Sequence, residues 1–387
     1  MTRVTVARSV EELEALREPW KQLQGRHFPT DPDAFLTILE HQPQAMRPHV
    51  LLLERDGEPR SLVLGRVEDL RLSAKLGYKE IFAPRMRSIT VVNEGLLGDA
   101  SEESAHILLA ELRASLAAGE ADVVRLRNLR LGSPLHRVAR SAPPALCRQH
   151  VSSPAVHWEL DLPGSPDEFL RSLSSSTREG VRRYGRKLEK EYGERLSLRI
   201  FREPAEIDEL FEQVEVVSAK TYQGGLGVAF AGDALQRSLT ALAMERGWFR
   251  AWVLSLDGEP VAFWHGEAYR GVFRIGVPGY DPAHARLRVG NYVLMRLVAD
   301  LCAEEGVDRV DYGFGDAEYK RRFGTRSWQE EDVLVYAPTA KAIGINVLRT
   351  IILTLVGLAG RILRQSELFA RIKRGWRARL SAGSSGG

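Results

Sequence analysis

Apolar and polar positions follow the same order twice along the chain. Residues 3–23 (RVTVARSVEELEALREPWKQL) predict a short strand followed by apolar positions at helical spacing, and residues 196–217 (LSLRIFREPAEIDELFEQVEVV) predict the same. Residues 49–67 and 249–268 each predict two strands that meet at an Asp-Gly turn within the shared tetrapeptide DGEP. Such a turn between apolar runs is a strong hairpin signal. The pattern therefore indicates one α/β unit present in two copies.

A third pair of matching segments extends this repeat. Residues 107–129 and 294–315 each predict a helix, a stop that contains Gly, and an apolar strand. The two copies divide near residue 150, in a stretch rich in Pro and Ser. We predict an α/β (α+β) fold with an N-terminal domain at 1–150 and a second domain at 151–340, each a mixed central sheet flanked by helices.

Charge is close to balanced in total and uneven along the chain. The 387 residues include 54 Lys and Arg against 51 Asp and Glu, a net charge of +3, which excludes a generally basic nucleic-acid-binding protein. Residues 341–387 carry nine basic residues and one acidic residue, so the rest of the chain is net negative. Within that rest, residues 171–202 hold ten basic and four acidic residues. Charge is thus concentrated in one internal helix and in the C-terminal segment.

Several classes of protein are disfavoured by what the sequence lacks. Cys147 and Cys302 are too few for a disulfide framework, and no signal-peptide pattern opens the chain, so a cytoplasmic location is expected. The longest apolar stretch, Thr350–Gly360, is shorter than a membrane span requires. The sequence has no His pattern of a metal site, no Walker loop, no G-x-G-x-x-G motif that opens a helix, and no G-x-S-x-G motif. We therefore expect no metal.

A candidate anion site lies where the last long helix of the second copy begins. The basic loop HARLRVGN precedes this helix, and Gly290 lets the backbone approach a ligand closely. Free N–H groups and the dipole of a helix start favour a phosphate there. Arg286 and Arg288 add positive charge beside it, although an ordinary basic turn has the same pattern.

Two further groups of polar residues are candidates for acid and base chemistry. Asp316, Tyr319 and Lys320 follow a strand at its carboxyl end, where open α/β sheets bind ligands. Tyr319 is a candidate acid for a leaving thiolate, and Asp316 is a candidate to orient an attacking amine. His265 and Glu267 lie two apart on a predicted strand and share a face, so either is a candidate base. A solvated loop, a core His and a rim Glu are the structural alternatives.

The basic helix offers a third candidate contact. Arg178, Arg182 and Arg186 are four residues apart and share one helix face, which suits a polyanionic ligand. Glu189, Glu191 and Glu194 follow them and could balance this face as an ordinary solvated surface.

The stretch from Tyr280 (YDPAH) to Gly324 (VGNYVLMRLVADLCAEEGVDRVDYGFGDAEYKRRFG) resembles the C-terminal half of GNAT-superfamily acyltransferases of the CelD-like type from cellulose biosynthesis. These are relatives of the Fem (FemAB-like) aminoacyltransferases. The upstream STREGVRRYGRKLEKEYG is similar to their basic helix. The resemblance extends from about Ser172 to Pro338, and the repeat agrees with the tandem GNAT layout of Fem-like proteins.

The resemblance implies an acetyl-CoA or other acyl-CoA donor and an amine acceptor, such as an amino sugar or another acceptor of envelope or polysaccharide biosynthesis. An aminoacyl-tRNA donor and a non-catalytic scaffold are the alternatives. By position it makes Val289, Gly290 and Asn291 the pyrophosphate loop and Tyr319 the thiolate-protonating residue. The remaining predicted contacts are to the substrate, a small-molecule or lipid-linked acceptor, and they are Arg178, Arg182, Tyr280, Asp281 and Lys320.

This sequence departs from the GNAT pattern in three places. The loop motif [QR]-x-x-G-x-[GA] has Leu287 first and Tyr292 last, and the preceding strand lacks the usual catalytic Glu. The matching loop of the first copy, NEGLLGDASEES, is acidic, so we expect that copy to shape the acceptor site without binding the donor.

The C-terminal segment 341–387 predicts a basic amphipathic helix with a Gly- and Ser-rich end. Through residues 341–380 it is expected either to contact an anionic membrane, which would make the protein peripheral to the inner membrane face, or to dock on the acidic body.

Overall fold

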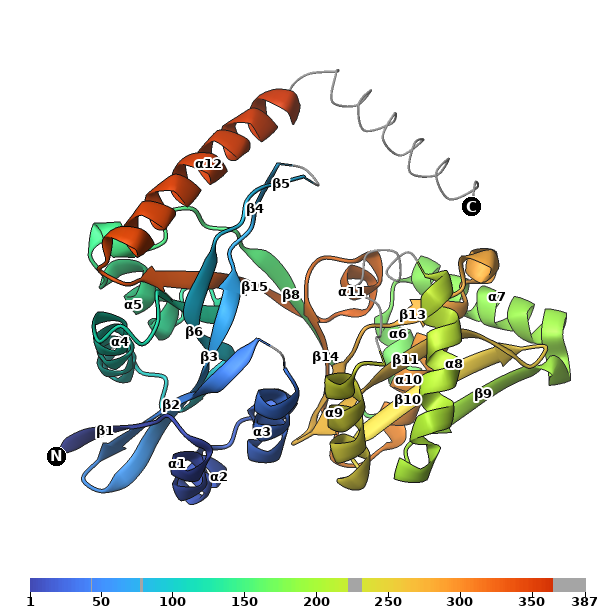
Figure 1. Ribbon diagram of the computed structural model, residues 1–387. Coiled ribbons are helices and arrows are strands. Elements are labelled where there is room, and N and C mark those ends of the chain that lie inside the picture. Colours follow the sequence, from blue (N-terminus) through green and yellow to red (C-terminus); the bar gives the residue numbers. More distant parts are fainter. Residues whose placement is uncertain (43, 77–78, 222–231, 365–387) are drawn as a thin grey trace.

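The computed structural model describes residues 1–42, 44–76, 79–221 and 232–364 (Figure 1). The N-terminal half contains β1 (Thr2–Ala7), α1 (Val10–Ala15), α2 (Arg17–Leu23), α3 (Pro32–His41), β2 (Ala45–Arg55), β3 (Glu58–Arg71), β4 (Ala74–Leu76), β5 (Lys79–Phe82), β6 (Arg85–Gly98), α4 (Glu102–Ala117), β7 (Val123–Arg130) and α5 (Pro134–Ser141).

The C-terminal half repeats this order after a leading strand and two helices. Its elements are β8 (Ala155–Asp161), α6 (Pro166–Ser172), α7 (Ser175–Tyr192), β9 (Leu196–Phe201), α8 (Ile207–Lys220), α9 (Ala234–Glu245), β10 (Phe249–Leu256), β11 (Glu259–Tyr269), β12 (Val272–Ile275), β13 (Gly279–Tyr280), α10 (Val289–Ala303), β14 (Arg309–Phe314), α11 (Glu318–Phe323), β15 (Arg326–Tyr336) and α12 (Ala340–Arg364).

The two predicted hairpins are confirmed. β2 pairs with β3 and β10 pairs with β11, both antiparallel. At the turns, Asp56 and Gly57 have φ of 54° and 84°, and Asp257 and Gly258 have φ of 54° and 83°. Two successive residues with positive φ fit the right-handed twist of the flanking strands, and Asp-Gly adopts that conformation readily.

One continuous sheet crosses both halves, and the last strand of the C-terminal half lies beside the N-terminal strands. The order is β1-β2-β3-β6-β7-β15-β8-β14-β12-β11-β10-β9, with β13 paired to β11. The last strand of the chain, β15, extends the N-terminal sheet beside β7, whereas β8 extends the C-terminal sheet beside β14. β15 and β8 pair with each other at the centre (Figure 1). Because the sheet does not break there, the boundary near residue 150 stays a prediction.

Helices cover both faces of each half. In β2, Leu51 and Leu53 pack with α4 and α5, while the alternate residues Val50 and Leu52 pack with α1 to α3. In β10, Trp252 and Leu254 pack with α10, while the intervening Val253 packs with α8 and α9. Apolar residues on both faces of a strand are expected where a sheet is covered on both sides.

The C-terminal helix α12 corrects the expectation that no segment is long enough to span a membrane. It begins at Ala340 and continues for 25 residues. Residues Ala340–Ala359 have a mean hydropathy of 1.9, which makes this helix long and apolar enough to cross a membrane by length and composition. The uninterrupted apolar run is shorter than the helix because Arg349 interrupts it, and a helix tolerates one such residue.

Candidate functional site

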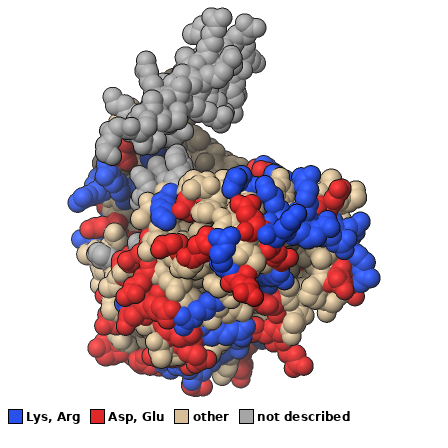
Figure 2. Space-filling view, turned by 90° about the vertical axis from the view of Figure 1, so that its right-hand side faces the viewer, with Lys and Arg blue, Asp and Glu red and all other residues tan. Residues whose placement is uncertain are grey.

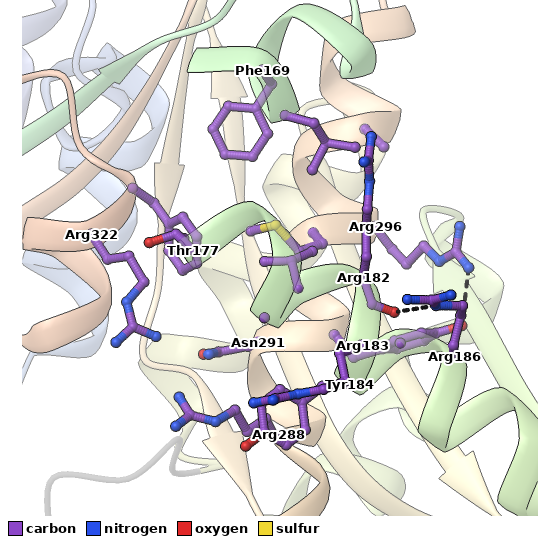
Figure 3. Close-up of a pocket in the computed structure, with 18 of the residues that line it drawn as sticks. Phe169, Thr177, Arg182, Arg183, Tyr184, Arg186, Arg288, Asn291, Arg296 and Arg322 are labelled. Atoms are coloured by element: carbon purple, nitrogen blue, oxygen red, sulfur yellow. Dashed lines mark hydrogen bonds between the residues drawn. The ribbon is translucent and has the colours of Figure 1, made fainter. Parts of the chain in front are cut away.

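A groove of about 850 Å³ lies between the basic helix α7 and the start of α10 in the C-terminal half. Its apolar floor includes Phe169 of α6, Val181 of α7, Met295 of α10 and Phe323 of α11. Six arginines line it, whereas Glu189 is its only carboxylate among the described residues (Figure 3). The arginines are Arg182, Arg183, Arg186, Arg288, Arg296 and Arg322. An apolar floor with a cationic rim suits a ligand that carries phosphates and an apolar part.

The single carboxylate of the groove is already engaged. Glu189 accepts hydrogen bonds from the hydroxyl of Tyr292 at 3.2 Å and from Arg296 at 2.9 Å. The guanidinium carbons of Arg183 and Arg288 each lie 5.0 Å from the ring centre of Tyr184. Arg322 pairs with Glu318 of α11, so Arg182, Arg183, Arg186 and Arg288 are the groove arginines that are not paired with a carboxylate among the described residues. Figure 2, which looks onto the side of the molecule that carries α7, shows Lys and Arg gathered on the upper part of this face.

The first turn of α10 opens into the groove without a capping side chain. Its N-cap residue, Arg288, has a left-handed backbone with φ of 54°, and the first turn holds no acidic residue. Arg288 and Asn291 line the groove, Val289 is buried, and the carbonyl of Gly290 accepts a hydrogen bond from Trp264 at 2.8 Å. Helix-start N–H groups without a cap favour an anion, so this end of the groove is a candidate phosphate site.

The corresponding helix of the N-terminal half has the opposite character. The hydroxyl of Ser101 caps α4 by accepting from the N–H of Ser104, and Glu102 and Glu103 occupy the first turn. These groups satisfy the free N–H groups and repel an anion. The structure thus gives a physical basis for the prediction that only the second copy binds a donor.

The sheet opens next to this helix start. β12 and β14 run parallel only as far as the pair Arg274 and Asp311. Beyond Ile275 the chain makes a bulge before β13, because three residues there face two on β11. A bulge redirects backbone groups away from the ladder. Val277 and Phe314, which follow the last paired residues, are 39% and 52% exposed, so the opening has an apolar rim.

Tyr319 lies near this opening on α11. Its ring makes edge contacts with Trp264 and Tyr312, at centroid distances of 5.2 Å and 5.8 Å. Burial raises the pKa of the Tyr319 phenol to about 12. The side chain therefore carries its proton at neutral pH, as an acid must. Trp264 joins it to the candidate phosphate site through the bond to Gly290.

Asp316 and Lys320 are engaged in local contacts. Asp316 is exposed and forms an ion pair with Arg321, one turn along α11. Lys320 is buried, and its ammonium donates to the carbonyls of Gly313 at 3.1 Å and Phe314 at 2.9 Å. Burial lowers the pKa of Lys320 to about 8. This lysine fastens α11 to the end of β14 and so holds the opening in shape.

His265 and Glu267 are both buried on β11. The His265 ring lies between Phe249 and Phe263, and burial lowers its pKa to about 4. Glu267 faces Arg274 across the β11–β12 pair, and burial raises the pKa of its carboxyl. Its Oε2 is buried and has no hydrogen-bond partner among the described residues. Of the two, Glu267 has the free acceptor that a base requires.

The remaining predicted residues are spread around the groove. Tyr280 is 47% exposed and its ring lies over the start of α10, about 3.7 Å from where a side chain on Gly290 would begin. Asp281 caps the 3-10 helix Pro282–Leu287 through the N–H of Ala283 and pairs with Lys220 at 3.2 Å. Two predicted arginines lie outside the groove lining: Arg286 pairs with Glu191 at 3.0 Å, and Arg178 donates to the carbonyl of Arg171 at 3.4 Å.

The structure adds a buried ionic cluster that sequence reasoning missed. His157 of β8 is within 2.7 Å of Asp311 and 3.2 Å of Glu330. Burial alone would lower the pKa of His157, but hydrogen bonds to these two carboxylates raise it to about 10. The ring stacks on Trp328, with centroids 4.5 Å apart. His157, Asp311 and Arg274 also line a second cavity of about 620 Å³ between the two halves.

Residues from β8, β14 and β15 meet in this cluster, and no local motif marks them. The available signal was the presence of charged residues inside apolar strand segments, as in HWELD and RVDYGF. Other residues missed by the sequence analysis, such as Arg296 and Arg322, enter the groove from α10 and α11. Among the described residues, no group of three or more His, Cys, Asp or Glu is placed to hold a metal ion.

Comparison with known families gives a match in the part of the chain that forms this site. Residues 175–321 match the family described as the acetyltransferase (GNAT) domain. The matched residues include α7, α10 and the opening between β12 and β14. Comparison with curated proteins gives no match.

Solved structures with similar folds support the tandem arrangement. FemX has a TM-score of 0.50 and 11% identity, over 75% of this chain and 88% of that one. The C-terminal domain of a candidate lysylphosphatidylglycerol synthetase from Agrobacterium fabrum has a TM-score of 0.50 and 11% identity, over 88% of this chain and 97% of that one. A tandem GNAT protein from the clavulanic acid biosynthesis pathway has a TM-score of 0.50 and 12% identity, over 88% of this chain and 100% of that one. At these identities the likeness establishes the fold, and it confirms the predicted tandem α/β class.

Proposed function

We propose, from the GNAT acetyltransferase domain that residues 175–321 match, that this protein transfers an acyl group from acyl-CoA to an amine. The observation that carries the proposal is the contrast between two equivalent helix starts. The start of α10 has no cap or acid and faces arginines across a groove, whereas the start of α4 is capped and acidic. The phosphates of a CoA-type donor are proposed to bind at the start of α10, and its apolar arm to lie on the floor of the groove.

The proposed reaction is direct transfer. The amine nitrogen attacks the thioester carbonyl, a C–N bond forms, the C–S bond breaks, and the thiolate leaves. A backbone N–H of the bulge after Ile275 is proposed to stabilise the developing oxyanion. Tyr319 is proposed to protonate the thiolate, and Glu267, through a water molecule, to accept the proton from the amine. Positioning supplies much of the acceleration in such a reaction.

The acceptor is proposed to enter from the cavity between the two halves. Arg274 and Asp311 line that cavity and also end the paired part of β12 and β14, so they connect it to the opening. Charged walls favour a polar amine, and an amino sugar or another envelope or polysaccharide precursor fits this chemistry. The CelD-like assignment and a cytoplasmic location belong to this proposal.

A Fem-type transferase that uses aminoacyl-tRNA is the second candidate. The six arginines of the groove and the basic residues along α7 offer more positive charge than a single CoA requires. FemX and the lysylphosphatidylglycerol synthetase domain share the fold. A non-catalytic scaffold is the third candidate function, because the loop motif departs from the GNAT pattern.

Release of free thiol from acetyl-CoA, measured with a panel of amines and amino sugars, tests the proposal. Acceptor-dependent release supports acyl-CoA as donor. A protein that releases no thiol but retains aminoacyl-tRNA on a filter is the Fem-type transferase, and a protein that does neither is a scaffold.

A further inference from the structure

The helix α12 carries a concentration of exposed apolar side chains. Among the described residues, fifteen large apolar side chains are exposed, and five of these lie on this one helix. They are Val347, Leu348, Ile351, Leu355 and Leu358, with exposures from 43% to 60%. Only 11% of the apolar window Ala340–Ala359 is buried in the protein. A core helix would bury most of it, so α12 is not explained by packing within the chain.

Among the described residues, the polar contacts that attach α12 to the body lie in its first three turns, from Lys341 to Arg349. Ala342 is fully buried, and the amide of Asn346 donates to the carbonyls of Leu146 and Arg148 at 3.0 Å and 2.9 Å. Lys341 pairs with Asp122 at 2.8 Å. Beyond these contacts the helix rises away from the N-terminal half (Figure 1). The docked turns therefore fix its direction, and residues 350–359 that follow are half-buried or exposed in the described part of the chain.

The projecting part carries no charge over eleven residues. Arg349 is the only charged residue from Ala342 to Gly360, and its side chain lines the cavity between the two halves. The eleven residues Thr350–Gly360 that follow contain two Thr and otherwise only apolar residues and Gly. Contact with an apolar environment would stabilise such a helix surface.

The basic residues next to this segment of α12 indicate which apolar environment it contacts. The sequence after Gly360 has seven basic residues and one acidic residue, so the apolar segment is followed directly by positive charge. Basic residues next to an apolar helix are attracted to anionic lipid headgroups.

We propose that the segment of α12 beyond Arg349 inserts into the surface of an anionic lipid bilayer and holds the protein there. This inference does not depend on the proposed transferase reaction, since it concerns a different surface.

Co-sedimentation of the full chain with lipid vesicles tests the inference. The wild-type protein is expected to pellet with vesicles that contain phosphatidylglycerol, and to bind phosphatidylcholine vesicles more weakly. The double variant Ile351→Glu, Leu355→Glu is expected to lose at least tenfold in partitioning to the anionic vesicles. The matched control, Leu131→Glu with Val216→Glu, changes two exposed apolar side chains elsewhere and is expected to bind as wild type.

Two outcomes would overturn the inference: wild-type protein that stays in solution with anionic vesicles, or a Glu double variant that pellets as well as wild type. A concentration-dependent dimer that the Ile351→Glu, Leu355→Glu variant abolishes, without vesicle binding by wild type, would instead assign the apolar surface to a second copy. Thermal unfolding of the variant checks that the body is intact. Acetyl-CoA binding, measured on the same variant, keeps this result separate from the donor proposal.

Discussion

Tyr319 lies against Trp264 and Tyr312, and burial keeps its phenol protonated. Replacement of Tyr319 by Phe retains the ring and removes the proton. If Tyr319 protonates the leaving thiolate, kcat is expected to fall by roughly 100-fold, which is within the range for loss of a general acid, while KM for the donor changes little. Steady-state kinetics with acetyl-CoA measure this, and unchanged turnover would remove the acid role.

His157 predicts a pH dependence of stability. Its pKa is raised from 6.5 to about 10 in the folded protein. A raised pKa gives a stabilising contribution that is complete below the unfolded value of 6.5 and is lost as the pH rises through about 10. The variant His157→Gln should therefore unfold at lower urea than wild type at pH 7, with a difference that shrinks towards pH 10. Groups such as Lys320 titrate in both proteins and cancel. A difference that stays constant with pH would contradict the charged state of His157.

At the scale of residues, the sequence could identify a chemical type but not its surroundings. It predicted Arg182, Arg288 and Asn291 as ligand contacts on two separate segments, and the fold brings them to one groove. It offered His265 as a base, but neighbouring aromatic rings bury it and lower its pKa. Burial depends on contacts between distant strands, so local spacing does not contain it.

At the scale of elements, the bulge after β12 depends on a glycine. A Cβ on Gly276 would lie 2.0 Å from the buried ring of His265. The ring has no room to move, so Gly276→Ala is expected to reduce the free energy of unfolding by about 1–3 kcal/mol. The matched control is Gly344→Ala in α12, where nothing lies within 4 Å of the added Cβ. That change is expected to be neutral or slightly stabilising.

Urea denaturation of both glycine variants checks this prediction. Equal stability of Gly276→Ala and wild type would show that the chain near β12 adjusts easily, and that the bulge is not a fixed feature of the opening.

The hairpins and helix starts were predictable because their signals are local. The Asp-Gly turns fixed β2–β3 and β10–β11, and the Ser residues that cap α4 and α7 stand directly before those helices. The helix long enough to cross a membrane was missed because only uninterrupted runs of apolar residues were considered. The mean hydropathy over the whole helical segment is the relevant quantity.

At the scale of the whole molecule, the central strands β15 and β8 join the two halves into one folding unit. β15 completes the N-terminal sheet and β8 completes the C-terminal one. Side chains also cross between halves, since Tyr269 donates to Asp31 at 2.9 Å and Arg26 pairs with Asp308 at 2.6 Å. We expect a single cooperative thermal transition by calorimetry. Two separate transitions would mean that the halves are stable independently.

The place of β15 could not be read from the sequence. The repeat predicted two similar units and did not indicate that the last strand of the second unit lies beside β7. The short connection between α11 and β15 and the ionic cluster of His157, Asp311 and Glu330 favour this arrangement, since the cluster forms only when β8, β14 and β15 are adjacent.

The central claim is that the groove between α7 and α10 binds the phosphates of an acyl-CoA donor. Isothermal titration of acetyl-CoA into wild-type protein, the double variant Arg182→Ala, Arg288→Ala, and the control Lys187→Ala measures it most directly. Lys187 is an exposed basic residue of the same helix outside the groove lining. We predict binding by wild type, at least tenfold weaker binding by the double variant because two charged contacts are lost, and no more than a twofold change for the control. No binding by wild type at millimolar acetyl-CoA, or equal affinity in the double variant, would contradict the claim.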